Sequence, residues 1–159
     1  MVNDASFTDG GEEPLRLQAQ NADDLPVLSS LVQDAVFPIK EMQWQAGRRR
    51  FALLLNRFRW EDSARANSQD RKFERTRSLL VIEGVMKVSS NGIDRSDKDM
   101  IFSLLSIEFE EGAEGAGKLV LTLAGDGAIA LDVETLDVSL QDVTRPYVAP
   151  SRKAPSHAE

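Results

Sequence analysis

The feature that most constrains the fold is a succession of short alternating apolar segments after residue 40. In Lys118–Ala124, for example, three leucines share one side, which is the pattern of a β-strand with one buried face. Tight-turn sequences, including Asn91–Gly92 and Gly125–Gly127, separate the segments. Because strands joined by such short turns pair antiparallel, the sequence predicts a mainly antiparallel sheet.

One helix is expected before most of these strands. Apolar residues at positions 25, 28, 31, 32 and 35 recur at helical spacing, which indicates an amphipathic helix of about 12 residues. Asp23 is suited to cap it and Pro26 to lie in its first turn. The expected strands are Leu15–Gln20, Glu41–Gln45, Arg49–Trp60, Phe73–Ser89, Met100–Glu110, Lys118–Ala124, Ala128–Thr135 and Leu136–Val143. The sequence thus predicts an α+β fold: one N-terminal helix with a curved, mainly antiparallel sheet or partly open barrel of six to eight strands.

A chain of 159 residues has the usual size of one domain. We expect a single α+β domain over residues 14–147. Residues 1–13 are polar, and residues 148–159 are rich in proline and polar residues. These two ends are expected to be a disordered arm and a disordered tail.

Composition excludes several classes of protein. With 42% hydrophobic and 28% charged residues, the chain is too apolar to be a disordered one. It has no cysteine, and so no disulfide, thiolate nucleophile or cysteine zinc site. The N-terminus lacks the pattern of a signal peptide, and apolar runs such as Phe51–Leu55 are too short to span a bilayer. We therefore expect a cytoplasmic protein with no membrane partner.

Charge is distributed unevenly along the chain. The segment Arg48–Arg77 holds ten basic and four acidic residues, a net charge of +6, whereas the whole chain carries −7. The remainder is therefore at −13. Nine of the ten bases are arginine, the side chain best suited to grip phosphate or carboxylate with two parallel hydrogen bonds.

The placement of these arginines suggests a binding site. Arg57 and Arg59 share a face at the end of one expected strand, and Arg75 and Arg77 share a face at the start of the next. If the two strands form a hairpin, all four could meet on one side beside Trp60. This arrangement predicts a site for an anion or an acidic partner. In the competing interpretation, the arginines form a solvated or edge-protecting face and pair with the acidic remainder of the domain.

Candidates for catalysis and metal binding are few. His157, the only histidine, lies in the expected tail, where a positioned general base is not expected. Asp94, Asp97 and Asp99 share one loop but lack the glycine and distal glutamate of a calcium loop, so we interpret them as a solvated turn. We predict no catalytic residue, no metal site and no cofactor.

Four segments carry a resemblance to a known family: Val32–Val36, Arg49–Glu61, Leu104–Phe109 and Leu121–Glu134. Together they resemble a family of short bacterial proteins, found mainly in alphaproteobacteria, that is catalogued as a domain of unknown function. The resemblance covers about residues 14–149. It implies a cytoplasmic bacterial protein and transfers no activity, cofactor or catalytic residue.

The favoured functional hypothesis is a non-enzymatic binding or accessory domain that contacts an anionic partner through the arginine-rich hairpin. The partner would be an unknown protein or an anionic ligand, with nucleic acid less favoured. One alternative is an enzyme or ligand-binding domain for an anionic small molecule, with Glu74 or Glu134 as the acting carboxylate. A second alternative is a homodimeric structural protein with an apolar sheet face at its interface.

Overall fold

The structure is a computed structural model of the chain, and it describes residues 14–59, 74–94, 96–143 and 147–148. In these residues eleven strands form one sheet beside a single α-helix, α1 (Leu25–Leu31). Three short 3₁₀ turns cover Ile39–Glu41, Ala46–Arg48 and Ala113–Gly115. The strands are β1 (Arg16–Ala19), β2 (Val36–Pro38), β3 (Met42–Gln45), β4 (Arg50–Phe58), β5 (Glu74–Glu83), β6 (Val85–Asn91), β7 (Ile101–Glu111), β8 (Gly117–Leu123), β9 (Gly127–Val133), β10 (Val138–Asp142) and β11 (Tyr147–Val148).

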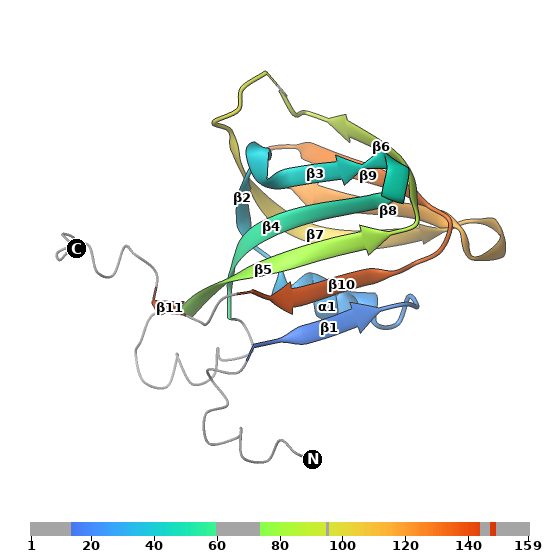
Figure 1. Ribbon diagram of the computed structural model, residues 1–159, viewed down its shortest axis with the longest axis horizontal. Coiled ribbons are helices and arrows are strands. Elements are labelled where there is room, and N and C mark those ends of the chain that lie inside the picture. Colours follow the sequence, from blue (N-terminus) through green and yellow to red (C-terminus); the bar gives the residue numbers. More distant parts are fainter. Residues whose placement is uncertain (1–13, 60–73, 95, 144–146, 149–159) are drawn as a thin grey trace, which may run out of the picture.

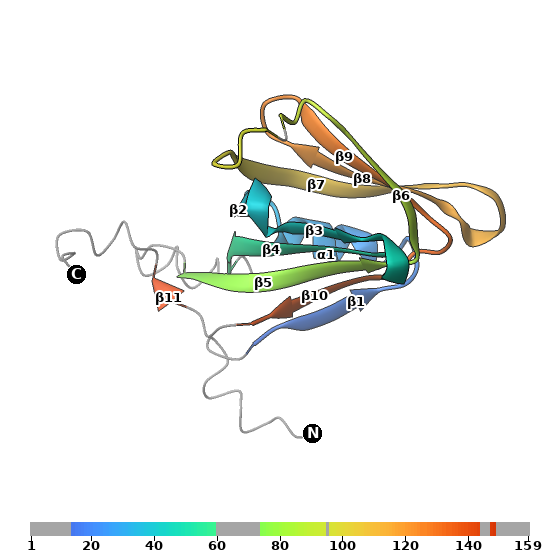
Figure 2. The same ribbon diagram turned by 45° about the horizontal axis from the view of Figure 1, so that its top comes forward.

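The sheet bends back on itself to form two layers (Figures 1 and 2). Its strand order is β1-β10-β5-β4-β2-β7-β8-β9-β6, with β3 added on β4 and β11 on β5, and these pairings are antiparallel. We call β1, β3, β4, β5 and β10 the first layer and β6 to β9 the second layer. The prediction of a mainly antiparallel sheet is confirmed.

The chain passes from the first layer to the second at Gly84, between β5 and β6. Gly84 has φ of 72°, a left-handed backbone that glycine adopts without steric cost. An added Cβ would also lie 3.1 Å from Cγ of Glu134. The Gly84 carbonyl accepts a hydrogen bond from the Glu134 N–H at 3.0 Å. This corner divides the single strand predicted over Phe73–Ser89 into two strands of different layers.

The predicted α+β class and its six to eight strands are wrong, since the described chain is mostly antiparallel sheet with eleven strands. The helix covers seven residues because the backbone after it turns away to β7. Asp34 has φ of 66°, and its N–H donates to the Leu104 carbonyl at 2.7 Å. Val32 and Ala35 are still buried, which explains why helical spacing extends beyond the helix. No helix in the described chain is long and apolar enough to cross a membrane.

The core lies between the two layers. On β4 the residues 51, 53, 55 and 57 are buried and the alternate residues are partly exposed, and Arg59, just after the strand, is buried as well. One face of the first layer is therefore an inner face. Inward leucines of both layers form the core with α1, which packs against β7. Among the described strands β3 pairs with β4 alone and β6 with β9 alone. The sheet is therefore open between β3 and β6.

Candidate functional site

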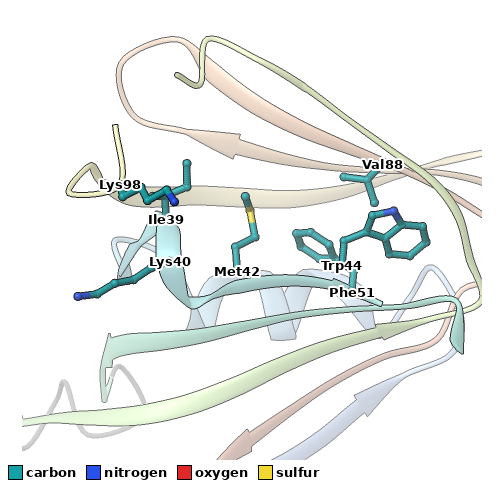
Figure 3. Close-up of a pocket in the computed structure, with 7 residues that line it drawn as sticks. All are labelled: Ile39, Lys40, Met42, Trp44, Phe51, Val88 and Lys98. Carbon is teal, nitrogen blue, oxygen red and sulfur yellow. The ribbon is translucent and has the colours of Figure 1, made fainter. Parts of the chain in front are cut away.

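A cavity of about 590 Å³ lies at this opening (Figure 3). Its lining residues come from β3, β4, β6, the turn before β3 and the loop before β7: Ile39, Lys40, Met42, Trp44, Phe51, Val88 and Lys98. Five of these seven side chains are apolar, and the other two are lysines. A concave, mainly apolar site of this volume is typical of small-molecule binding.

Strand register places the apolar side chains in the cavity. Met42 and Trp44 lie opposite Leu53 and Phe51 across the β3–β4 pairing, and directly paired residues share one face of a sheet. The Met42 and Trp44 side chains therefore both lie on the inner face of the sheet. Val88 of β6 projects toward Trp44 from the second layer (Figure 3). The cavity is thus closed on two sides by strands that do not pair with each other.

The lining has a buried apolar floor and a more exposed rim. Phe51 is 1% exposed and forms the floor, whereas Trp44 is 37% exposed at the rim. The seven lining residues include no carboxylate, hydroxyl, imidazole or thiol. Among the described lining residues, the cavity therefore combines apolar contact surface with positive charge from the two lysines.

The predicted hairpin exists, but it does not bring the four arginines together. In the pairing of β4 with β5, Arg57 lies opposite Thr76 and Phe58 opposite Arg75. Arg57 and Arg59 are therefore on the inner face, and Arg75 and Arg77 are on the outer face. A register differing by one residue would have placed all four on the same side. Trp60, the fifth predicted site residue, lies outside the described residues.

Arg57 belongs to a buried polar cluster at one end of the inner face. Its guanidinium donates from Nε to the Ser78 hydroxyl at 3.0 Å and from Nη2 to both carboxylate oxygens of Asp142, at 3.0 and 3.2 Å. Arg59 Nη1 lies 3.7 Å from Asp142 Oδ2. The Arg57, Arg59 and Asp142 side chains are almost completely buried. Removing one partner from such a cluster leaves buried charge uncompensated.

Asp142 also anchors β1. Its Oδ2 accepts a hydrogen bond from the Leu15 N–H at 2.8 Å, and its own N–H donates to the Leu15 carbonyl at 2.9 Å. The Ser78 hydroxyl donates to Oδ1 at 2.6 Å. One carboxylate thus joins β10 to β5 and to the start of β1, so the cluster acts as a structural anchor.

Asp142 and Ser78 were not among the predicted site residues, although the sequence carries a signal for them. Asp142 lies two residues after the buried Leu140 in β10, and Ser78 lies two residues before the buried Leu80 in β5. Each therefore points to the same inner face as its apolar neighbour. A polar residue in the apolar phase of a strand points into the core, where it needs a partner.

The outer face of the first layer is positively charged. Its described strand residues include four arginines and one glutamate: Arg16, Arg50, Arg75, Arg77 and Glu83. Arg50 Nε pairs with Glu83 at 3.0 Å. The Arg75 guanidinium lies 4.2 Å above the Phe58 ring, a cation–π contact. Arg77 and Arg16 are exposed.

Two of the acidic groups considered from the sequence, Asp94 and Glu134, are exposed and have partners in the described chain. Asp94 accepts hydrogen bonds from the Ser96 hydroxyl and N–H, which lower the pKa of Asp94. Glu134 lies at the surface, 3.4 Å from Arg49, and the Glu74 side chain is outside the described part. No three acidic or histidine side chains gather as metal ligands within the described residues.

Comparison with curated proteins and with solved structures found no match. A family described as "protein of unknown function (DUF2948)" matches residues 15–157, nearly the whole chain. The family resemblance inferred from the four sequence segments is therefore confirmed as far as a domain of unknown function is concerned. By this match the chain belongs to the DUF2948 family.

Proposed function

We propose that this protein is a non-enzymatic binding domain whose cavity between β3 and β6 holds an elongated, mainly apolar small molecule. The observation that carries this proposal is the cavity of about 590 Å³ with five apolar lining side chains at the open side of the sheet. The alternative considered from the sequence was an enzyme or ligand-binding domain for an anionic small molecule. The present proposal differs from it in placing the site at the opening of the sheet and in making the ligand mainly apolar.

The cavity offers binding energy without a large rearrangement. Phe51 is fixed by the pairing of β4 with both β3 and β5, so the floor is preformed. Trp44 and Met42 present apolar surface beside it. Covering such surface is favourable by about 25 cal/mol per Å², and a preformed site avoids much of the ordering cost of binding.

Calorimetric titration with dodecanol and with dodecanoate tests this proposal. We expect saturable binding of one molecule per chain for at least one of these two probes. A change in Trp44 fluorescence, measured in a Trp60→Phe background, should follow the same curve, because Trp44 lies on the rim. If neither probe binds, or if binding leaves the emission unchanged, the proposed function is wrong.

A second candidate function is supported by the charge of the outer face. Four arginines against one glutamate, on a chain of net charge −7, provide a basic surface for an acidic protein segment. This basic surface includes Arg75 and Arg77, which the sequence predicted to bind an anion, and also Arg16. Arg57 and Arg59 do not belong to it because they are buried.

Binding of an acidic peptide tests the second candidate. With a polyglutamate peptide at low salt, Arg16→Gln/Arg77→Gln should weaken binding about tenfold, since each exposed charge contact contributes up to about 1 kcal/mol. Lys87→Gln/Lys118→Gln removes the same charge from exposed positions of the second layer and serves as the control. Equal losses in the two variants would show that only net charge matters and would eliminate this surface.

Cytoplasmic location and self-association stay predictions from the sequence.

A further inference from the structure

The two ends of the cavity differ in chemistry. Ile39, Lys40 and Lys98 lie at one end, and Trp44 and Val88 lie at the other, with Met42 between them (Figure 3). Among the described lining residues, positive charge is therefore found at one end. A ligand that is apolar along its whole length would make no ionic contact with the lysines at this end.

Lys98 is the lysine placed to meet a ligand. Its side chain extends toward Ile39 at the edge of the cavity, whereas the Lys40 side chain is directed away (Figure 3). Both lysines are exposed. Neither pairs with a carboxylate among the residues that the structure describes. The Lys98 ammonium can thus contact a ligand head that remains in solvent while the tail lies on Phe51 and Met42.

The surroundings of Lys98 limit the charge of that head. Asp97 and Asp99 flank it in the sequence, and both are exposed. Asp97 Oδ1 accepts a hydrogen bond from the Asp99 N–H at 3.2 Å, which holds one carboxylate within the loop. Two neighbouring negative charges oppose a dianionic phosphate more strongly than a monoanion, because repulsion grows with the charge of the head.

The remaining lining limits the tail. Ile39, Met42, Trp44, Phe51 and Val88 form the apolar part of the cavity wall. Their side chains offer only the Trp44 indole N–H as a donor and the Met42 sulfur as a weak acceptor. A polar group placed among them would lose its water without gaining a partner, which is unfavourable. The tail is therefore expected to be a hydrocarbon chain.

From these observations we infer that the occupant is a single-chain amphiphile with a monoanionic head such as a carboxylate, bound with its head at Lys98 and its chain toward Trp44. This inference rests on the proposed function and adds the ligand class and its orientation. A free fatty acid and a fatty acid within a bilayer share this chemistry.

The test compares three probes of equal chain length on three proteins. Dodecanoate, dodecanol and dodecylamine are titrated into the wild type, Lys98→Met and Lys118→Met. Lys98→Met should weaken dodecanoate binding roughly three- to fivefold, as expected for one exposed ion pair, and should leave dodecanol unchanged. Dodecylamine, which is cationic, should bind more tightly to Lys98→Met than to the wild type. Lys118→Met, at an exposed position of β8 outside the cavity lining, should change dodecanoate binding by less than about twofold.

The outcomes separate this inference from the proposed function. If dodecanol and dodecanoate both bind and Lys98→Met changes their affinities equally, Lys98 does not contact the head group. The inference then fails, while the proposed binding function of the cavity stands. If no probe binds, the proposed function itself fails. Unilamellar vesicles containing dodecanoate, added in place of the free acid, distinguish the two sources: capture of the monomer leaves the protein off the vesicles in a flotation assay.

Discussion

Replacing Asp142 with alanine is expected to lower the free energy of unfolding by about 3–5 kcal/mol, the usual cost of breaking a buried charge cluster on one side. The change would leave the buried Arg57 guanidinium without the carboxylate that now accepts three of its hydrogen bonds. It would also remove the acceptor for the Leu15 N–H and the Ser78 hydroxyl. Strand β1 should therefore loosen together with the end of β10.

Urea unfolding monitored by circular dichroism measures this effect. Asp137→Ala is a suitable control, because Asp137 lies at the surface and accepts one exposed hydrogen bond from Gln18. Its effect should stay within about 0.5 kcal/mol, as for most surface substitutions. An Asp142→Ala protein as stable as this control would show that the cluster does not hold the first layer together.

Replacing Val88 with phenylalanine is expected to weaken binding of both dodecanol and dodecanoate by more than about tenfold. The larger side chain would keep the ligand off part of the apolar lining, and the contact area lost in this way accounts for several kcal/mol of binding energy. Val88 projects from β6 toward Trp44 across the cavity (Figure 3), so the larger ring would occupy space that a ligand needs. Val88 also packs against the core, so urea unfolding of the variant is measured alongside, and we expect it to remain folded because the cavity offers room for the added ring.

Ser89→Phe is the matched control for this substitution. Ser89 is the next residue along β6, it is exposed, and alternate residues of a strand point to opposite faces. The control should keep the affinity of the wild type. A Val88→Phe protein that still binds the probes with normal affinity would place their site elsewhere on the molecule.

The sequence predicted local structure well wherever alternation was long and turns were short. Segments such as Arg49–Trp60 and Lys118–Ala124 became β4 and β8, because their periodicity follows directly from one buried face. The helix was predicted too long because tertiary hydrogen bonds to β7 redirect the chain at Asp34. The Gly84 corner was missed because apolar residues continue on both sides of it.

The site depended on information that the sequence carries less directly. The sequence predicts which arginines share a face within one strand. It does not predict which face that is, because the register that places Arg57 inside and Arg75 outside depends on how β4 pairs with β5. The opening depends on strands that do not pair: β3 and β6 belong to segments far apart in the strand order. Trp44 and Val88 therefore meet through the bend of the whole sheet, which no local pattern specifies.

The measurement that tests the central claim most directly is methyl NMR of the protein labelled at its four methionines during titration with dodecanoate. Met42 lines the cavity, whereas Met86 is 53% exposed on β6 and is not part of its lining. The cavity account predicts that the Met42 methyl signal shifts in a saturable way, with one ligand per chain, while the Met86 signal stays in place. A Met42 signal that does not move, or a shift at Met86 alone, would contradict it.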